Sequence, residues 1–205
     1  MNAQTDNRLI IVGNRSIERF HPLISGARLI LEDNHMNLLI RSEETTDFET
    51  IYNFVKLAFK TASHSDGSEQ DFINELRRSP SYIKELALVA EDEKKIIGHI
   101  MLTKFQIQGK HQAFETLLLA PLAVDLEYRK CGIGSALVLQ SFELAKQMGY
   151  ESVIVLGDPA YYSRFGFKPS THFGITCLNE IPFEFIQACE LIKGSLTHIS
   201  GAIQF

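Results

Sequence analysis

One stretch limits the folds open to this chain more than any other. Between residues 114 and 149, an apolar segment, a short glycine-containing loop and a long amphipathic segment follow one another. The apolar segment "FETLLLAPLAV" is typical of a buried strand, and the amphipathic one of a helix. The loop between them carries R-x-x-G-x-G, formed by Arg129, Gly132 and Gly134. A strand that leads through a loop into a long helix is the crossover of a sheet, so the pattern predicts an α/β or α+β domain.

The rest of the chain extends this pattern. A strand from Met36 and two helices up to about Ser79 are expected, with Asp47 as an N-cap and Pro80 ending the second helix. Two apolar runs between residues 85 and 107, joined by the charged "EDEKK", predict an antiparallel hairpin. After the long helix, capped by Gly149, come a strand, a turn with a short helix, and a mixed tail. The expected order, β-α-α-β-β-β-α-β-α-β, gives a mixed sheet with helices on both faces.

Composition excludes several classes of protein. With 205 residues, 45% of them hydrophobic, the chain can bury a core without disulfides or metals. The formal net charge of -5 argues against a general nucleic-acid binder, and no apolar run approaches the roughly 20 residues of a membrane span. Three cysteines without C-x-x-C spacing favour a reducing, cytoplasmic location. The seven histidines have no metal-ligand spacing, so no metal is expected.

The glycine loop fits neither of two common nucleotide motifs. A dinucleotide-binding loop requires a third glycine where Leu137 stands, and no segment has the spacing of a P-loop. A helix N-terminus nevertheless offers unpaired N–H groups and a partial positive charge. Gly132 and Gly134 let the backbone approach an anion, and Arg129 and Lys130 add cationic donors. From these residues alone, a phosphate cradle and a plain glycine-rich helix entrance remain equally open.

Four segments in the same order resemble one family. "PLAVDLEYRKCGIGSAL" resembles the acyl-CoA-binding segment of the GNAT superfamily of N-acetyltransferases, whose signature is [RQ]-x-x-G-x-[GA]. "VLGDPAYYSRFGF", "ELALVAEDEKKIIGHI" and the tail "IPFEFIQACELIKGSL…SGAIQF" are similar to its YhbS-like subgroup. The resemblance runs from about Asn37 to Phe205. It implies a GNAT-like fold, with a central, mostly antiparallel sheet, helices on both faces and a splayed strand pair.

The resemblance also implies where acetyl-CoA, as co-substrate, is bound. The pyrophosphate is expected on the amides of the loop and first helical turn, which are Arg129, Lys130, Cys131, Gly132, Ile133, Gly134 and Ser135. The pantetheine arm is expected to pair with the splayed strand at Leu122, Ala123 and Val124. Pro121 fits there, because a strand whose ladder is interrupted leaves backbone groups free for a ligand. Two positions depart from the family pattern: Leu126 replaces a proline, and Lys130 a frequent glycine.

A tyrosine is the candidate catalytic residue. Acetyl transfer to an amine expels the CoA thiolate, which benefits from a proton donor, and a tyrosine with a pKa of about 10 keeps its proton at neutral pH. Tyr162 lies four residues before Gly166, the position from which GNAT tyrosines are proposed to protonate the thiolate. The resemblance therefore implies Tyr162 as general acid, with Tyr161 packing beside it. The alternative is that both rings only line the core or the cofactor.

The general base is not identified by the sequence. Leu118 occupies the position of the strand-borne glutamate of some relatives, and strand alternation points Glu115 to the opposite face. His99, in the apolar run "IIGHIM", and His64, in a polar loop, are possible bases, although a lone histidine in an apolar strand is more often a core group. A water chain serves equally well. Cys131 is expected to be ordinary filler, since no histidine pattern supports a nucleophile.

Together these features predict an enzyme, an acetyl-CoA-dependent N-acetyltransferase acting on a primary amine of a small molecule or peptide by direct attack in a ternary complex. The alternative is a non-catalytic acyl-CoA-binding sensor, and a weaker one is a degenerate site. Acetyl-CoA and an amine are the expected partners, with no nucleic acid or membrane, and the protein is expected to be a monomer or homodimer.

The domain boundary is expected near residue 37. Residues 1–36 form an N-terminal extension of uncertain status, and residues 37–205 the N-acetyltransferase domain. Because Met36 directly precedes the first expected strand of that domain, it is a possible start of translation.

Overall fold

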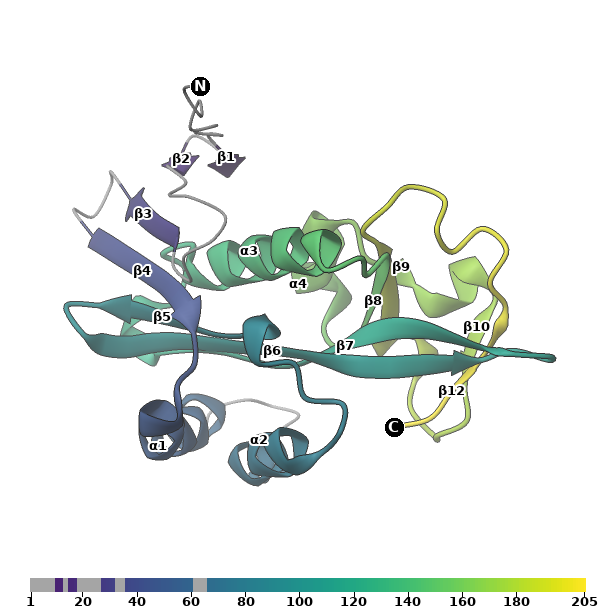
Figure 1. Ribbon diagram of the computed structural model, residues 1–205, viewed down its shortest axis with the longest axis horizontal. Coiled ribbons are helices and arrows are strands. Elements are labelled where there is room, and N and C mark those ends of the chain that lie inside the picture. Colours follow the sequence, from purple (N-terminus) through teal and green to yellow (C-terminus); the bar gives the residue numbers. More distant parts are fainter. Residues whose placement is uncertain (1–9, 13–14, 18–26, 32–35, 61–65) are drawn as a thin grey trace, which may run out of the picture. The chain divides into compact units, whose positions relative to one another are not determined.

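The computed structural model describes residues 10–12, 15–17, 27–31, 36–60 and 66–205 (Figure 1). The chain forms two compact units, each assembled from separate segments. Unit 1 consists of Met1–Glu75, Ala87–Ile100 and Leu122–Gln140. Unit 2 consists of Leu76–Leu86, Met101–Pro121 and Ser141–Phe205. Four elements contribute residues to both units. They are helix α2 (Glu69–Arg78), strand β6 (Lys95–Gln108), strand β7 (Ala113–Val124) and helix α3 (Ile133–Gln147).

Unit 1 begins with a small separate hairpin and continues into the main sheet. Among the described residues, strand β1 (Ile10–Val12) pairs with β2 (Arg15–Ile17), in antiparallel register. Strand β3 (Ala27–Leu31) pairs antiparallel with β4 (Met36–Ser42), which pairs antiparallel with β5 (Ala87–Asp92). Only Glu93 and Lys94 connect β5 to β6, and their φ angles of 47° and 70° are the positive values that a tight hairpin turn of type I′ requires. The predicted hairpin is thus confirmed.

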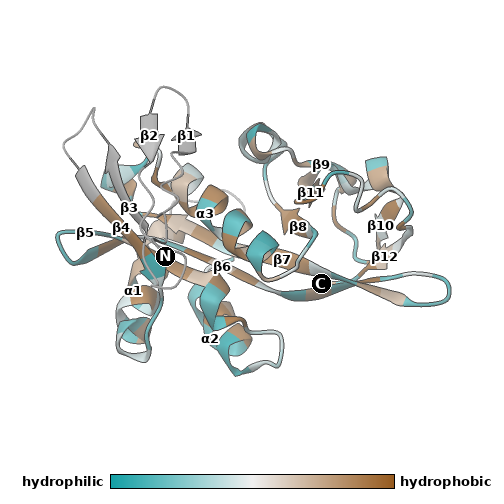
Figure 2. Ribbon diagram, turned by 45° about the horizontal axis from the view of Figure 1, so that its top comes forward, coloured by the Kyte–Doolittle hydropathy of each residue, from teal (hydrophilic) through white to brown (hydrophobic). Residues whose placement is uncertain are grey.

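The two N-terminal helices pack through one face each. Helix α1 (Phe48–Phe59) buries Ile51, Val55 and Ala58, which recur at helical spacing. Helix α2 ends at Arg78, two residues before Pro80, as predicted. Figure 2 shows polar residues over the outer surface of α2. In unit 1, α1 lies on one face of the sheet and the start of α3 on the other (Figure 1), so helices cover both faces as expected.

Asp47 stands at the N-cap position of α1 but does not cap it through its side chain. Its carboxylate accepts two hydrogen bonds from the Arg41 guanidinium, at 2.6 and 3.1 Å, and one from the Glu44 N–H at 2.8 Å. Arg41 also bonds to Glu91 on the neighbouring strand. The sequence prediction therefore had the right position, while the carboxylate stabilises the turn between β4 and α1 and not the first turn of the helix.

Unit 2 contains the parallel part of the sheet. Strand β8 (Ser152–Leu156) pairs in parallel with β7 and antiparallel with β11 (Ile186–Glu190). The hydrogen-bonded order is β3-β4-β5-β6-β7-β8-β11-β9, with β9 at Lys168–Pro169. Strand β10 (Ile175–Cys177) pairs with β12 (Gly201–Ile203), which also pairs with β6. The mixed, mostly antiparallel sheet is the predicted fold, whereas β3, β9, β10 and β12 are too short to be foreseen from periodicity.

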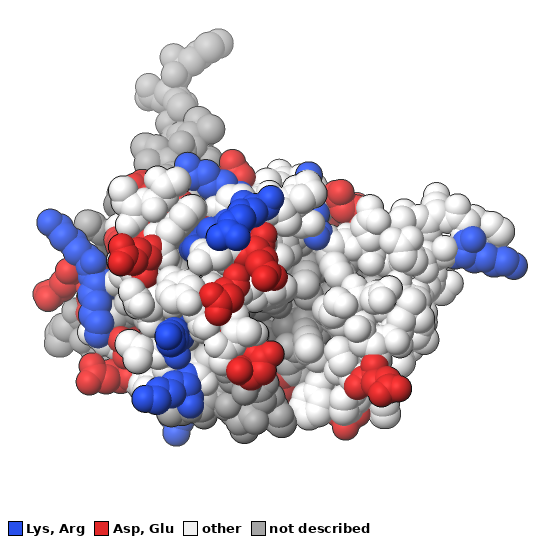
Figure 3. Space-filling view, turned by 90° about the horizontal axis from the view of Figure 1, so that it is seen from below, with Lys and Arg blue, Asp and Glu red and all other residues white. Residues whose placement is uncertain are grey.

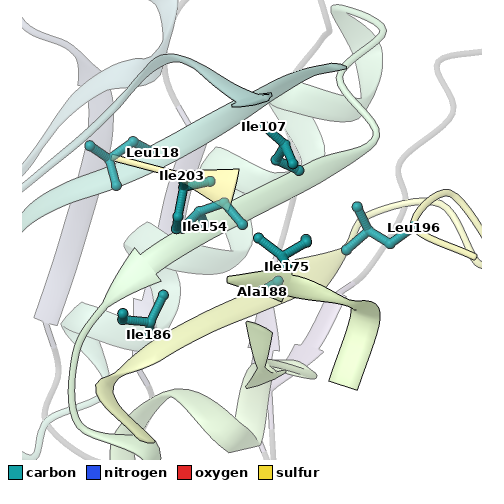
Figure 4. Close-up of a cluster of buried hydrophobic side chains, with 8 residues drawn as sticks. All are labelled: Ile107, Leu118, Ile154, Ile175, Ile186, Ala188, Leu196 and Ile203. Atoms are coloured by element: carbon teal, nitrogen blue, oxygen red, sulfur yellow. The ribbon is translucent and has the colours of Figure 1, made fainter. Parts of the chain in front are cut away.

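Eight buried apolar side chains form the core of unit 2 (Figure 4). They come from strands far apart in the sequence, since β6, β7, β8, β10, β11 and β12 all contribute. The members are Ile107, Leu118, Ile154, Ile175, Ile186, Ala188, Leu196 and Ile203. The tail, whose mixture of patterns gave no clear element boundaries, thus supplies half of this core.

Helix α3 ends where the sequence predicted. Gly149 has a φ of 89°, and the Tyr150 N–H donates to the Ala145 carbonyl over 3.0 Å, which is the bond of a Schellman motif. No described helix is both long and apolar enough to cross a membrane. Of residues 1–36, the described part comprises β1, β2, β3 and the first residue of β4, and the expected boundary at residue 37 stays a prediction.

Candidate functional site

The glycine loop that leads into helix α3 follows a short turn stabilised by side-chain contacts. After β7, residues Leu126–Tyr128 form one 3-10 turn, whose Glu127 N–H is capped by the Asp125 carboxylate at 3.0 Å. The Asp125 N–H donates to the Ile97 carbonyl over 2.9 Å, and its carboxylate forms an ion pair with Lys95, also at 2.9 Å. Burial alone would raise the pKa of Asp125, but the bonds from Lys95 and the Glu127 N–H hold it below its usual value. The carboxylate therefore stays charged and holds the turn.

Two residues of the loop adopt left-handed backbone conformations. Gly132 has a φ of 88° and Lys130 a φ of 65°. Glycine adopts such angles at no steric cost, whereas a side chain there costs on the order of 1 kcal/mol. This geometry favours glycine at the position of Lys130. Lys130 adopts the left-handed angle despite this cost, and its exposed cationic side chain lies at the start of the helix.

The first turn of α3 presents a row of amides. The Ala136 N–H donates to the Gly132 carbonyl over 2.9 Å, which is the first bond of the helix. The N–H groups of Gly132, Ile133, Gly134 and Ser135 consequently have no acceptor within the helix. With the helix dipole, four such donors form the kind of site at which phosphate groups bind in proteins. The expected cofactor residues of the loop are thus contiguous, and the donors concentrate at their C-terminal half.

Gly98 on β6 determines how closely α3 approaches the sheet. A Cβ atom at this position would lie 2.9 Å from Leu137 Cδ1, 3.0 Å from Ile133 Cγ2 and 3.2 Å from Ala90 Cβ. These distances are shorter than ordinary van der Waals contacts, so only glycine allows the first turn of α3 to pack here without displacement. The sequence contains this residue in "IIGHIM", but nothing in the pattern distinguishes it from a strand glycine of no consequence.

Arg129 has a role that the motif did not reveal. Its Nη2 donates to the carbonyl of Ala58 over 2.7 Å, and its Nε contacts the carbonyl of Val124 at 3.5 Å. Ala58 lies in the last turn of α1, where carbonyls have no intrahelical partner and a cation is favourable. The guanidinium, which the sequence suggested as a phosphate donor, here ties the loop to α1. Arg129 and Lys130 are both exposed.

The strand before the loop continues beyond its pairing with β8. The β7–β8 register joins Leu117, Leu118 and Leu119 to residues of β8, whereas β7 extends to Val124. Among the described residues, Leu122, Ala123 and Val124 have no partner in that register. The Ala120–Pro121 peptide bond, which is cis, lies just after the last pair. The pairing with β8 therefore ends before Pro121, while β7 itself runs on through Pro121 to Val124. The splayed strand pair stays a prediction.

Tyr162 is held by close contacts within unit 2. It ends the short helix α4 (Pro159–Tyr162), whose first turn is capped by the Asp158 carboxylate. A Cβ atom on Gly157 would lie only 2.2 Å from the Tyr162 ring, so the ring rests directly on the backbone at the end of β8. Tyr161 and Phe167 flank the ring at centroid distances of 5.1 and 5.5 Å. Tyr161 is indeed the packing partner, as predicted.

Burial favours the protonated form of the Tyr162 phenol. Desolvation raises its pKa well above the usual value, and Tyr161 raises it slightly more. The phenol is therefore neutral throughout the neutral pH range. Gln187 on β11, itself buried, donates from Nε2 to the Gly157 carbonyl over 2.9 Å and so holds the backbone under the ring. Sequence reasoning missed Gln187, since one polar residue in the tail carries no recognisable signal.

The candidate bases lie in different environments. Leu118 belongs to the unit 2 core, and Glu115 is exposed near Tyr150, whose pKa it raises after the larger effect of burial. His99 is completely buried, and its Nε2 lies 3.0 Å from Oε2 of the equally buried Glu43. His64 lies outside the described residues. Glu43, absent from the sequence prediction, sits in the acidic run "SEETTD", where nothing marks it as the buried member.

The remaining predictions concern cysteines and metals. Cys131 Sγ lies 3.6 Å from the Arg129 carbonyl, and no disulfide forms among Cys131, Cys177 and Cys189. Burial, and then the neighbouring Glu190, raises the pKa of Cys189 to about 11, so this thiol stays protonated. In the part of the chain that the structure describes, no group of three or more metal-ligating side chains comes together.

The chain is similar in sequence to known acetyltransferases. A family profile described as "Acetyltransferase (GNAT) domain" matches residues 84–169. The "Uncharacterized N-acetyltransferase YhbS" of Escherichia coli (strain K12) is 30% identical over 169 residues, which cover 82% of this chain and 96% of that protein. The "Uncharacterized N-acetyltransferase YjhQ" of the same organism is 36% identical over 110 residues, or 54% of this chain and 61% of that protein.

Solved structures share the fold. The crystal structure of the GNAT family N-acetyltransferase YhbS from Escherichia coli, in complex with CoA, has a TM-score of 0.73 and 27% identity and covers 91% of this chain and 92% of that one. A GNAT family acetyltransferase from Brucella melitensis, in complex with acetyl-CoA, has a TM-score of 0.62 and 26% identity, over 76% of this chain and 89% of that one. Both of these proteins therefore hold CoA or its acetyl ester.

Proposed function

This chain belongs to the GNAT acetyltransferase family, and on that premise we propose that it transfers the acetyl group of acetyl-CoA to a primary amine by direct attack in a ternary complex. The observation that carries the proposal is the first turn of α3, where the N–H groups of Gly132, Ile133, Gly134 and Ser135 have no intrahelical acceptor. Two solved relatives that bind CoA or acetyl-CoA support the same ligand.

The loop and the strand before it supply the binding chemistry. The four amides and the helix dipole favour a pyrophosphate, and the exposed Lys130 adds charge beside them. Leu122, Ala123 and Val124, which continue β7 beyond its pairing with β8, offer backbone groups to the amides of a pantetheine arm. Arg129 and Asp125 act by holding the loop, through Ala58 and Lys95 respectively. Cys131 contributes backbone only.

Acetyl transfer forms one covalent bond and breaks another, and it requires proton transfers at the amine and at the leaving thiolate. The amine nitrogen forms a bond to the acetyl carbon as the carbon–sulfur bond breaks, and the sulfur leaves as a thiolate. Tyr162 gives its phenolic proton to that thiolate. Its raised pKa keeps the phenol protonated at neutral pH, so the proton is present when the thiolate leaves. The contacts with Gly157, Tyr161 and Phe167 restrict the ring to one orientation.

An acyl-CoA-binding sensor is the second candidate, because Leu118 in the unit 2 core stands where some relatives carry a glutamate base. Calorimetric titration with acetyl-CoA, together with a thiol-release assay over a panel of small amines, amino-acid derivatives and peptides, separates the two functions. An acetyltransferase binds acetyl-CoA and releases CoA with at least one amine. Binding without release on any amine would favour the sensor, and absence of binding would contradict both proposals.

A further inference from the structure

The buried pair of Glu43 and His99 has features that a packing role does not require. Both side chains are completely excluded from solvent, and their 3.0 Å contact joins Oε2 of Glu43 to Nε2 of His99. Removing a carboxylate from water is expensive, and replacing such a pair by apolar residues is often neutral or stabilising. A pair that is costly in this way is a candidate for a chemical role.

The contact defines the state of the imidazole. A carboxylate only accepts hydrogen bonds, so Nε2 of His99 carries the proton and donates it to Glu43. In the neutral ring, Nδ1 then holds a lone pair. Nδ1 is buried and has no hydrogen-bond partner in the structure. A doubly protonated ring would leave a buried N–H donor unpaired, which costs about 1–3 kcal/mol. The resting histidine is therefore an oriented, neutral base, backed by a carboxylate as in a catalytic triad.

Glu43 is held in place by a rigid turn. Its own N–H donates to the Ala87 carbonyl over 2.8 Å, which extends the β4–β5 ladder by one residue. On both sides of it, Arg41 and Asp47 are joined by the two guanidinium–carboxylate bonds, and the Glu44 N–H also donates to Asp47. The carboxylate thus has a defined position before any ligand binds, which is what a group that orients a base requires.

His99 points away from the side on which α3 lies. Successive side chains of a strand alternate between faces, and the Cβ direction of Gly98 leads to Ile133 and Leu137 of α3. His99 therefore faces the side of α1 and α2. There α1 buries Ile51, Val55 and Ala58, and α2 buries Gln70 and Ile73. Glu43 is the titratable group in contact with His99 there. The two helices also carry the titratable residues Glu49, Tyr52, Lys56, Glu69, Asp71, Glu75, Arg77 and Arg78.

Two buried side-chain oxygens of α2 have no hydrogen-bond partner. Gln70 Nε2 donates to the Gly67 carbonyl and to Asp71, so the orientation of its amide is settled and its Oε1, buried, has no partner. Glu69 Oε2 is likewise buried without a partner. Together with Nδ1 of His99, these are all the buried side-chain nitrogen and oxygen atoms without partners in the described part of the chain, and all three are acceptors. A ligand rich in N–H groups is complementary to them.

The surface over these helices fits a cation. Figure 3 shows acidic and basic side chains interspersed on the face that carries α1 and α2. From Asp47 to Arg78, six acidic residues stand against four basic ones. The acidic ones are Asp47, Glu49, Asp66, Glu69, Asp71 and Glu75, and the basic ones are Lys56, Lys60, Arg77 and Arg78. The mild acidic excess favours the approach of an ammonium group.

We propose that His99, oriented by Glu43, is the proton acceptor for the attacking amine, and that the acceptor is a cationic primary amine entering on the α1 and α2 side. This inference rests on the proposed function. An ammonium proton passes to Nδ1, which leaves a neutral amine with the lone pair that forms the bond to the acetyl carbon. A second proton leaves the nitrogen as the amide forms and replaces the one that Tyr162 gives to the thiolate. His99 returns its proton to solvent, so each turnover releases one proton.

The test compares two acceptors that differ only in whether they need a base. The first is the most active primary amine of the panel, and the second is its alkoxyamine analogue, in which oxygen replaces the carbon next to nitrogen. For propylamine the analogue is O-ethylhydroxylamine. The alkylamine, with a pKa of about 10, is protonated at pH 7, whereas the alkoxyamine is already neutral. General-base catalysis contributes about 100-fold or more. His99→Gln should therefore lower kcat for the alkylamine about 100-fold and change kcat for the alkoxyamine less than 3-fold.

Four further measurements make the test decisive. Glu43→Gln should lower kcat for the alkylamine about 10-fold, and both deficits should shrink as the pH rises toward the pKa of the amine. Thr103→Val, a matched change at another buried polar residue of β6, should leave the ratio of the two rates unchanged. The affinity for acetyl-CoA should be the same in all variants. In the wild-type protein, nitrogen NMR of labelled histidine should report His99 protonated on Nε2, a result that does not depend on how the variants fold.

The outcomes separate this inference from the proposed function. Equal losses for both acceptors, undiminished rates in both variants, or a wild-type His99 ring protonated on Nδ1 would overturn the role of His99 while the protein remains an acetyltransferase. Failure of the wild-type protein to acetylate any amine would overturn the proposed function and this inference with it.

Discussion

The two units treat their buried polar groups in opposite ways. In unit 2, Thr116 and Ser152 share a hydrogen bond of 2.8 Å, and Ser170 donates to the Ile175 carbonyl over 2.9 Å. In unit 1, by contrast, lie all three buried side-chain atoms without partners that the described residues contain, on Glu69, Gln70 and His99. Each such atom costs about 1–3 kcal/mol. The contrast suggests that unit 2 is built for stability, whereas unit 1 gives up stability for binding and chemistry.

The same contrast appears in the charged groups. In unit 1, hydrogen bonds from Arg41 hold the pKa of Asp47 below its usual value, against the opposing effect of burial. In unit 2, burial raises the pKa of Cys189 and of Tyr162. Unit 1 thus depends on groups that must be ionised, and unit 2 on groups that must stay neutral. The predictions below test this difference, beginning with the largest expected effect.

Gly134→Asp should destroy the anion site of unit 1. Gly134 is buried in the first turn of α3, and a carboxylate there adds both bulk and negative charge where a pyrophosphate is proposed to bind. Calorimetric titration should show the affinity for acetyl-CoA lowered at least 100-fold. Gly149→Asp, at the other end of the same helix with no atom within 4 Å of an added Cβ, is the control. Similar losses of affinity in the two variants would contradict the assignment of the first turn.

Tyr162→Phe removes the proposed acid of unit 2 and leaves the ring in place. Without a donor for the thiolate, kcat should fall about 100-fold, while the affinity for acetyl-CoA stays within 2-fold of wild type. Tyr161→Phe is the matched control, because it keeps the edge-to-face contact of 5.1 Å with Tyr162. Thiol-release kinetics over a range of pH measure both. If kcat of Tyr162→Phe equalled that of the wild-type protein at every pH, the acid role would be wrong.

Alkaline pH should destabilise the protein through Cys189. Its pKa is raised to about 11 in the folded state, from an ordinary value near 8.5 in the unfolded chain. Between these values the unfolded chain binds fewer protons than the folded one, so the free energy of unfolding falls as pH rises. The stabilisation is fully present below about pH 8.5, and about 3 kcal/mol is lost by pH 11. Cys189→Ala should flatten this slope in denaturant unfolding at successive pH values. An unchanged slope would show that another group is responsible.

At low pH, unit 1 should be the sensitive part. Because the pKa of Asp47 is lowered in the folded state, the stabilisation is present above the unfolded value near 3.9 and is lost as pH falls through the folded value below it. Asp47→Asn should therefore reduce the acid dependence of unfolding below about pH 4. It should leave the alkaline slope of Cys189 unaltered. An acid dependence identical to wild type would show that the Arg41–Asp47 pair is not responsible.

Gly98→Ala gives the smallest expected effect and tests the packing on which the anion site depends. The added methyl group would lie 2.9 Å from Leu137 Cδ1, so α3 or the side chain must shift, at a cost of about 1–2 kcal/mol of stability. Acetyl-CoA affinity should fall severalfold, because the first turn moves with the helix. The double variant Gly98→Ala/Leu137→Val, which makes room at that contact, should recover part of both losses. No recovery would mean that the backbone of β6 itself is disturbed.

Local patterns in the sequence predicted most of the fold. Strand periodicity, the charged link of the hairpin and the glycine at 149 correctly indicated the elements from residue 36 to residue 157. They did so because side-chain alternation, turn chemistry and helix capping depend on neighbours close in the chain. The sequence did not indicate the short strands β9, β10 and β12. Two or three residues show no periodicity, and they form strands because they pair with neighbouring strands.

The candidate site likewise has a part that the sequence indicated and a part that it did not. The motif R-x-x-G-x-G and Y-x-x-x-G-F identified the amides of α3 and the tyrosine, because a helix entrance and a glycine turn are local structures. Three contacts were not foreseen from the sequence. They are the hydrogen bond from Arg129 to the Ala58 carbonyl, the one from Gln187 to the Gly157 carbonyl, and the contact between the buried Glu43 and His99. These contacts join residues 71, 30 and 56 positions apart.

The sequence by itself thus determined the family, the main order of elements and the loop at the entrance of α3. Only the tertiary structure decided which of the acidic residues in "SEETTD" is buried, and which nitrogen of His99 lies against it. The reason is physical. Backbone conformation follows from residues that are neighbours along the chain, whereas the charge and protonation of a buried side chain depend on whatever group folding brings within about 3 Å of it.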